Sequence, residues 1–141
     1  MAIVETDFLV ALSSKEDRHH AEVRRLLGEL EGVLLSPYSL VELDLLIISG
    51  VLRVRPAAFY GALARVLSYY GVTVVRPKPS HLAKAWELRD NYDSTFFDSL
   101  HAAVAMEEGE ALVSYDRRYS GIEGLTYICL LYTSPSPRDR G

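Results

Sequence analysis

Short apolar runs alternate with longer amphipathic segments along most of this sequence, and that alternation limits the folds it can adopt. Each run is at most five residues long, which suits a strand better than a helix, and the runs lie at 2–4, 33–35, 72–75, 111–114 and 126–130. Strands that are largely apolar are buried on both faces, and helix-length connections between them favour a parallel arrangement. The sequence therefore predicts an α/β fold, a three-layer α/β/α sandwich around a mostly parallel sheet.

Helix-length segments with their own start and stop signals separate the runs. We expect helices at 8–12, 15–30, 36–48, 56–70, 80–89 and 95–107. Ser36 and Pro37 fit the N-cap and the first position of the third helix, because a hydroxyl satisfies an unpaired backbone N–H and proline has none to satisfy. Ser80 is expected to cap the helix that it begins, and either Ser94 or Thr95 is expected to cap the last helix.

The composition is that of one globular domain. The 141 residues are 49% hydrophobic and 24% charged, with a formal net charge of −4, so no overall basic field attracts nucleic acid or an anionic membrane. Cys129 is the single cysteine, which excludes an intrachain disulfide and a cysteine zinc site and fits a cytoplasmic location. No segment reads as a signal peptide or a membrane span, so no membrane partner is expected.

The last ten residues differ from the rest of the sequence. Residues 132–141 are rich in proline and serine and lack apolar periodicity, which predicts a disordered tail. The tail also resembles translated vector sequence, so it need not be native. We therefore expect one domain over residues 1–131 and exclude 132–141 from the fold.

Four acidic residues stand at the side of the predicted sheet where ligands bind. Asp7 and Asp116 come shortly after the strands at 2–4 and 111–114, Glu42 lies in the helix after the second strand, and Asp98 begins a late helix. Ligands of open parallel sheets bind beyond the carboxyl ends of the strands. We expect the four carboxylates to converge at that edge.

Each carboxylate also has an ordinary structural explanation. Asp7 and Asp98 could belong to helix caps, and Glu42 stands at capping-box spacing from Ser39. Asp116 could close an Asx turn. Together these explanations require four coincidences at one edge of the sheet, so a shared function is the simpler hypothesis.

A cluster of carboxylates needs a countercharge, since neighbouring carboxylates repel each other and burial raises their pKa values. Oxygen ligands without cysteine or paired histidines favour Mg²⁺, with Mn²⁺ as the other choice, over Zn²⁺. A divalent ion with water in its open positions suits phosphodiester hydrolysis, because it polarises the phosphate and produces hydroxide. The residues thus indicate a metal-dependent hydrolase.

Four segments resemble the acidic motifs of PIN-domain nucleases, and most of all the VapC-type toxins of type II toxin–antitoxin systems. The segments are 6–9 (TDFL), 39–42 (SLVE), 97–103 (FDSLHAA) and 112–116 (LVSYD), and the resemblance extends in order over residues 2 to 130. It implies that Asp7, Glu42 and Asp98 are Mg²⁺ ligands and that Asp116 is a fourth acid at the metal site. It also implies a PIN-like α/β/α fold, endoribonuclease activity, a homodimer and inhibition by a small antitoxin.

Residues beside the acids are expected to assist them. By resemblance, Ser114 is a hydroxyl that steadies the site, and Thr6 and Ser39 are expected to lie behind the metal ligands. Arg117 and Arg118 follow the last acid and are the residues that we expect to contact RNA phosphates.

Alternative interpretations concern both residues and function. His101, one turn after Asp98, could support the metal ligands, but it is interpreted as an ordinary half-exposed side chain, and His19 and His20 as part of a solvated helix face. The alternative function is a PIN-like domain without activity that binds RNA or protein as a scaffold; the apolar Leu9, two positions after Asp7, favours it, and the intact acids oppose it. An aspartyl-phosphate phosphatase is disfavoured because it needs a second aspartate at position 9.

Overall fold

A five-stranded sheet in the order β3–β2–β1–β4–β5 forms the centre of the fold, and every neighbouring pair is parallel. The computed structural model describes residues 1–130, and the tail expected at 132–141 lies outside them. The strands are β1 (Ala2–Val4), β2 (Val33–Leu35), β3 (Thr73–Val74), β4 (Ala111–Ser114) and β5 (Tyr127–Cys129). The predicted parallel sheet is confirmed, although β3 and β5 are shorter than expected.

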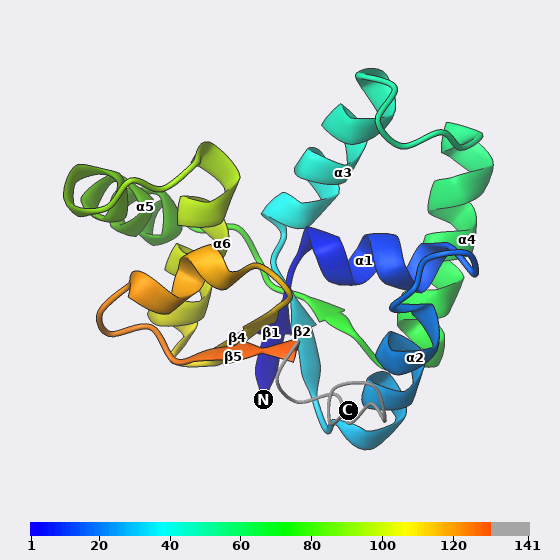
Figure 1. Ribbon diagram of the computed structural model, residues 1–141, viewed down its shortest axis with the longest axis horizontal. Helices are drawn as coiled ribbons and strands as arrows, with labels where there is room; N and C mark the ends of the chain where they lie inside the picture. The colour runs from blue at the N-terminus through cyan, green and yellow to red at the C-terminus, as the bar shows by residue number, and fades with distance from the viewer. Residues whose placement is uncertain (131–141) are drawn as a thin grey trace, which may run out of the picture.

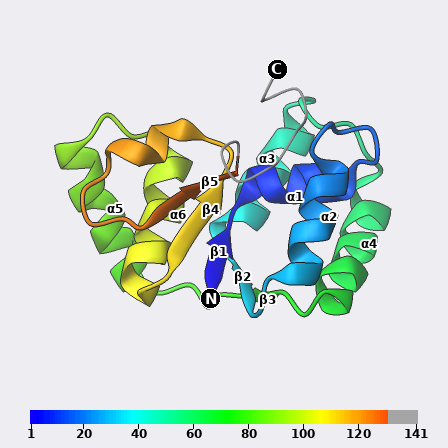
Figure 2. The same ribbon diagram turned by 60° about the horizontal axis from the view of Figure 1, so that its bottom comes forward.

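Helices cover both faces of the sheet, so the predicted three-layer α/β/α sandwich is confirmed (Figures 1 and 2). One face carries α5 (Pro79–Asn91) and α6 (Phe96–Glu108), and the other carries α1 (Thr6–Ser13), α2 (His20–Glu29) and α4 (Pro56–Tyr69). Helix α3 (Tyr38–Ile48) follows β2 and contacts both α1 and α6. A 3₁₀ helix, η1 (Arg117–Gly121), follows β4. None of the helices within residues 1–130 has the length and apolarity needed to cross a bilayer.

The apolar core lies in two clusters, one on each face of the sheet, because side chains alternate along a strand. In β1, Ile3 packs into the cluster that contains Ala103 of α6, whereas Val4 packs into the cluster that contains Phe8 of α1. All four side chains are buried. A strand buried on both faces has no position for a polar side chain, which explains the continuous apolar run at the start of the sequence.

The strand order places a ligand-binding crevice at the carboxyl ends of β1 and β4. From β1, the chain continues to β2 on one side, and β4 lies on the other side, so the direction of the connections reverses at β1. This reversal point is where open α/β sheets bind ligands. Helix α1 leaves β1 at that edge, and η1 leaves β4 there.

Helix α2 begins later than the sequence pattern suggested. The pattern predicts a start at residue 15, but residues 15–19 form turns and a bend. The backbone N–H of Asp17 donates to the Ser14 carbonyl at 3.1 Å, and the Asp17 carboxylate accepts from the backbone N–H of His19 at 2.8 Å. These local hydrogen bonds compete with the helix, which starts at His20.

Of the three predicted caps, one is confirmed and two are wrong. The Thr95 hydroxyl accepts from the backbone N–H of Asp98 at 3.3 Å and caps α6. The Ser36 hydroxyl instead lies 2.7 Å from Nδ1 of His101 and does not cap α3. Ser80 lies inside α5, where the helix already begins one residue earlier.

Candidate metal-binding active site

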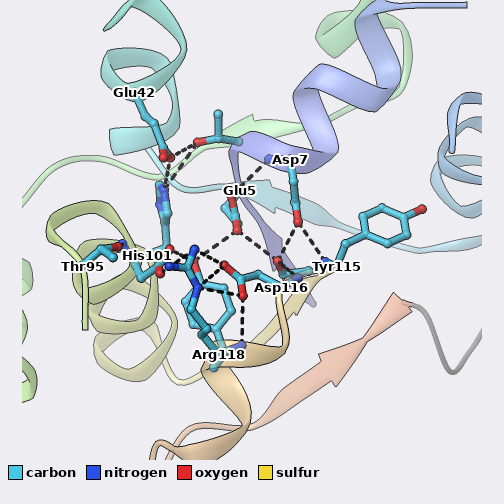
Figure 3. Close-up of polar contacts among 12 residues, drawn as sticks. Glu5, Asp7, Glu42, Thr95, His101, Tyr115, Asp116 and Arg118 are labelled. Atoms are coloured by element: carbon cyan, nitrogen blue, oxygen red, sulfur yellow. Dashed lines mark hydrogen bonds and ion pairs between the residues drawn. The ribbon is translucent and has the colours of Figure 1, made fainter. Parts of the chain in front are cut away.

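A cleft of about 350 Å³ at the carboxyl ends of β1 and β4 is lined by carboxylates from several elements (Figure 3). The four acids predicted from the sequence, Asp7, Glu42, Asp98 and Asp116, all line it. A fifth acid, Glu5, lies among them. The fold therefore places the four predicted carboxylates in one cleft, together with Glu5 and, also in its lining, Asp17.

Glu5 is the first residue after β1, and its side chain is almost fully buried, at 5% exposure. Its carboxylate accepts a hydrogen bond from the Tyr119 hydroxyl at 3.1 Å and lies 3.0 Å from the Ser114 hydroxyl. It also caps α1 by accepting from the backbone N–H of Asp7 at 3.1 Å, so Asp7 itself is not the cap. The signal in the sequence was an acid placed directly after the first apolar run.

Asp7 lies in the first turn of α1, next to Glu5. Its Oδ2 atom accepts from the Ser114 hydroxyl at 2.8 Å and from the backbone N–H of Tyr115 at 2.9 Å. Its Oδ1 atom is buried and has no hydrogen-bond partner within residues 1–130. The predicted support from Ser114 is thus in place, and one oxygen is left without a partner.

The environment of Glu5 and Asp7 disfavours two negative charges. Burial, and then the charge of Glu5, raises the pKa of Asp7 to about 7, despite the hydrogen bonds from Ser114 and Tyr115. Burial likewise raises the pKa of Glu5. The two carboxyl groups therefore retain a proton near neutral pH unless a cation compensates their charge.

Glu42 reaches the cleft from α3 and has different surroundings. Its Oε1 atom accepts a hydrogen bond from the Thr6 hydroxyl and lies 2.8 Å from Nε2 of His101. Burial raises the pKa of Glu42, but the hydrogen bonds from His101 and Thr6, with nearby positive charge, outweigh burial and bring the pKa below its ordinary value. Ser39, also expected near Glu42, has a buried hydroxyl that makes no hydrogen bond in the described part of the chain.

The expectation of a half-exposed His101 is wrong, because its side chain is buried and lies beside the cleft. Helix α6 is packed against α5, α3 and β4, so residues 98–105 are all buried. The ring of His101 contacts Glu42 and also lies 3.4 Å from the Thr6 hydroxyl. The one signal is its place one turn after Asp98, and a histidine at helical spacing from apolar residues fits a half-exposed face equally well.

The adjacent histidines of the α1–α2 connection do not form a solvated face either. The ring of His19 stacks on Tyr115, with ring centroids 4.0 Å apart, and lines the cleft. Nδ1 of His20 lies 2.9 Å from the Ala11 carbonyl oxygen. Both side chains are partly buried.

Asp98 and Asp116 flank the guanidinium of Arg118. Nη2 of Arg118 lies 3.2 Å from Oδ2 of Asp98 and 2.7 Å from Oδ2 of Asp116. Asp98 also accepts from the Tyr119 hydroxyl at 3.3 Å. Asp116 accepts from the backbone N–H of Arg118 at 2.9 Å, so the Asx-turn geometry is present as well. Burial raises the pKa of Asp116, but the hydrogen bonds and charge of Arg118 outweigh it and bring the pKa below its ordinary value.

The predicted RNA contacts lie at the rim of this site. Arg118 is 64% exposed, and its guanidinium covers two of the acids. Arg117 is exposed and lies beside it in η1. Their contact with RNA stays a prediction.

The donor atoms of the cleft suit a divalent cation. Glu5, Glu42 and His101 each offer one ligand atom, and these atoms all lie within 4.8 Å of one another. Carboxylate oxygens predominate, as in sites for Mg²⁺ and Mn²⁺. The buried Oδ1 of Asp7 without a partner also fits a site that is completed by a cation.

Comparison with known proteins identifies the family. Residues 2–125 match the family model of the PIN domain. The chain belongs to the PIN-domain family. The family predicted from the four acidic motifs is thereby confirmed. No curated protein sequence matches the chain.

Solved structures with the same fold include three toxin or toxin–antitoxin structures. VapBC2 of Rickettsia felis, bound to a promoter DNA fragment, has 18% identity and a TM-score of 0.71 over 91% of this chain and 97% of that one. VapBC-1 of nontypeable Haemophilus influenzae has 15% identity and a TM-score of 0.68 over 94% and 98%. The sarcin-ricin loop cleaving toxin VapC20 of Mycobacterium tuberculosis has 23% identity and a TM-score of 0.66 over 89% and 99%. At these identities the likeness concerns the fold.

Proposed function

We propose that this chain is a metal-dependent endoribonuclease that serves as the toxin of a toxin–antitoxin pair. The observation that carries the proposal is the cleft in which Glu5, Asp7, Glu42, Asp98 and Asp116 come together. Membership of the PIN-domain family supports a nuclease that acts on nucleic acids. A cluster of this kind, with more acidic than basic groups, is suited to binding a cation rather than to direct contact with RNA.

The metal would be Mg²⁺, with Mn²⁺ as the other candidate, and it would be held by acids of the cleft, namely Glu5, Asp7, Glu42, Asp98 and Asp116. When bound, such an ion provides hydroxide from a coordinated water and stabilises negative charge on a phosphate. Glu42 is suited to bind the cation as a carboxylate, because its pKa lies below the ordinary value. Asp7 and Glu5 would lose their retained proton as the ion binds.

The other side chains of the cleft hold the acids in place. The Tyr119 hydroxyl lies within hydrogen-bond distance of both Glu5 and Asp98, and the Ser114 hydroxyl lies within hydrogen-bond distance of both Glu5 and Asp7. Such fixed contacts let a site act without reorganising during the reaction. At the rim, the exposed guanidinium of an arginine can donate two parallel hydrogen bonds to an RNA phosphate.

The choice of RNA and of an antitoxin partner draws on the structural relatives. VapC20 of Mycobacterium tuberculosis is described as a sarcin-ricin loop cleaving toxin, which supports RNA as the substrate. Two other relatives are toxin–antitoxin structures, which supports a small antitoxin as a partner. A toxin that cleaves cellular RNA would act in the cytoplasm.

A homodimer is part of the proposal, and α3 offers a face for it. Large apolar side chains along α3 and just after it are exposed, namely Val41 at 55%, Leu45 at 48%, Ile48 at 73% and Val51 at 75%. Contiguous exposed apolar side chains are typical of protein contact surfaces. The mass of the protein in solution tests this part of the proposal.

The test of activity is cleavage of a mixed tRNA and rRNA pool by the purified protein. We expect discrete fragments with Mg²⁺, none with EDTA, and none with Asp98→Asn, whereas Asp90→Asn, an exposed acid of α5, should cleave like the wild type. Cleavage that persists in EDTA or in Asp98→Asn would contradict the proposal. No cleavage and no stabilisation by Mg²⁺ would favour the scaffold instead, since specific binding must raise stability.

A further inference from the structure

His101 has no part in the function proposed so far, although it touches one of the acids. We propose that His101 is a positioning residue that holds the carboxylate of Glu42 for metal binding, with Ser36 as the group that fixes its ring. The inference rests on the proposed metal site and names two residues that complete it.

The ring of His101 is held from both of its nitrogens. Nε2 lies 2.8 Å from Oε1 of Glu42, and Nδ1 lies 2.7 Å from the Ser36 hydroxyl. The side chain is 1% exposed, and Phe97 stacks on it with ring centroids 6.3 Å apart. Buried and engaged at both ends, the ring has no room to adopt another orientation.

These contacts specify a hydrogen-bond direction. The Thr6 hydroxyl donates to Oε1 of Glu42, so this oxygen is an acceptor. The His101 Nε2–H therefore donates to the same oxygen, and the Ser36 hydroxyl contacts the other ring nitrogen, Nδ1. The contact also explains why Ser36, in the sequence position of an N-cap, does not cap α3.

The arrangement leaves one oxygen of Glu42 available. Oε1 accepts from both Thr6 and His101, whereas Oε2 accepts no hydrogen bond from any residue of the described chain. A carboxylate fixed through one oxygen presents the other in a defined direction. Ligands of metal ions are commonly held in this way by hydrogen bonds from behind.

Direct binding of a metal by His101 is the competing role. Its Nε2 atom is close enough to Glu5 and Glu42 to form part of a cation site. However, Nε2 carries the proton that Glu42 accepts, and Nδ1 is engaged by Ser36. An ion at Nε2 would break the bond to Glu42, so the geometry favours the positioning role.

The test is the affinity for Mn²⁺, measured by calorimetry on the full chain. We expect His101→Asn, which cannot reach Glu42, to bind Mn²⁺ about 10–100-fold more weakly, the range for loss of a group behind a metal ligand. His101→Gln, whose amide can extend to the former position of Nε2, should recover part of the affinity. The control is His81→Asn, because His81 is equally buried but bonds Tyr38 and Glu108 outside the cleft.

Two further measurements separate positioning from a general effect on folding. In the Glu42→Gln background, His101→Asn should cause no additional loss of affinity, since the carboxylate that it positions is gone. Ser36→Ala, a smaller change, should weaken Mn²⁺ binding in the same direction if His101→Asn does not fold. A merely structural role would lower the melting temperature in EDTA and leave the affinity of the folded protein unchanged.

Each outcome decides a different part of the account. Equal Mn²⁺ affinities for the wild type and His101→Asn, or an equal loss in the Glu42→Gln background, would overturn the positioning role alone. A nitrogen coupling from His101 in the spin-echo spectrum of bound Mn²⁺ would overturn it in favour of direct ligation. Failure of the wild type to bind Mn²⁺ would overturn the metal site and the inference together. Metal binding without RNA cleavage would contradict only the proposed activity.

Discussion

Replacement of Asp7 by asparagine is expected to stabilise the metal-free protein at alkaline pH. Burial and the charge of Glu5 raise the pKa of Asp7 from an ordinary 3.8 to about 7 in the folded chain. The folded state therefore binds this proton more tightly than the unfolded state. The resulting stability is fully present at acidic pH and is lost as the pH rises through the folded pKa. Above that pH the folded protein retains a buried charge that asparagine does not have.

The size of the effect follows from the change in pKa. Each pH unit corresponds to about 1.4 kcal/mol, so the free energy of unfolding should fall by at most about 4 kcal/mol as Asp7 ionises. The new amide group must also occupy the place of Oδ1, which has no partner among residues 1–130. That unsatisfied group costs about 1–3 kcal/mol, so we expect a net gain of about 2 kcal/mol. For a domain of this size that gain raises the melting temperature by about 5–10 °C.

Thermal unfolding in EDTA measures this gain. Asp7→Asn and the wild type are compared at about pH 8, where the wild type holds the charge, and at about pH 5, where it does not. Asp90→Asn, which removes an exposed acid, is the matched control and should change the melting temperature little. A variant that is no more stable than the wild type at the higher pH, or that gains equally at both, would refute the reasoning.

Three other results are expected. Metal affinity should rise between about pH 6 and pH 8, because binding releases the proton retained by Asp7 and Glu5. Calorimetry in buffers of different ionisation enthalpy counts the released proton. A pH-independent affinity would contradict the role of these two acids in metal binding. Tyr119→Phe removes the hydroxyl that lies between Glu5 and Asp98 and contacts both, so Mn²⁺ should bind about tenfold more weakly, with an unchanged binding isotherm as the contrary result. Arg118→Ala removes the cation paired with Asp98, so Mn²⁺ should bind more tightly while KM for RNA rises; a constant KM would exclude a contact between Arg118 and RNA.

The architecture could be predicted from the sequence because strands that are buried on both faces of the sheet appear as continuous apolar runs. A strand such as β1 has no solvent-facing position, so its residues are all apolar. The alternation of such runs with helices then allows few topologies. The pattern did not predict the start of α2. Hydrogen bonds between Asp17 and the neighbouring backbone stabilise turns before the helix, and apolar periodicity does not reveal such local contacts.

The candidate site could be predicted in part, because the positions of its acids relative to the strands can be read from the sequence. Asp98 and Asp116 lie in recognisable segments and at expected distances from β4, so the fold places both at its carboxyl end. Glu5 was not selected because an acid at a strand end also fits a helix cap, and it does cap α1. His101 was misjudged because its burial depends on how α6 packs against α3 and α5, and helical periodicity alone does not determine that packing.

The central claim is that the carboxylates of the cleft form one metal site, and a crystal grown with Mn²⁺ tests it most directly. Data collected at the manganese absorption edge locate the ion by its anomalous scattering. We expect a peak within the cleft, in contact with Glu42, Asp98 and at least one of Glu5 and Asp7. A cleft without a peak at saturating Mn²⁺, or a peak only at other surface carboxylates, would contradict the claim.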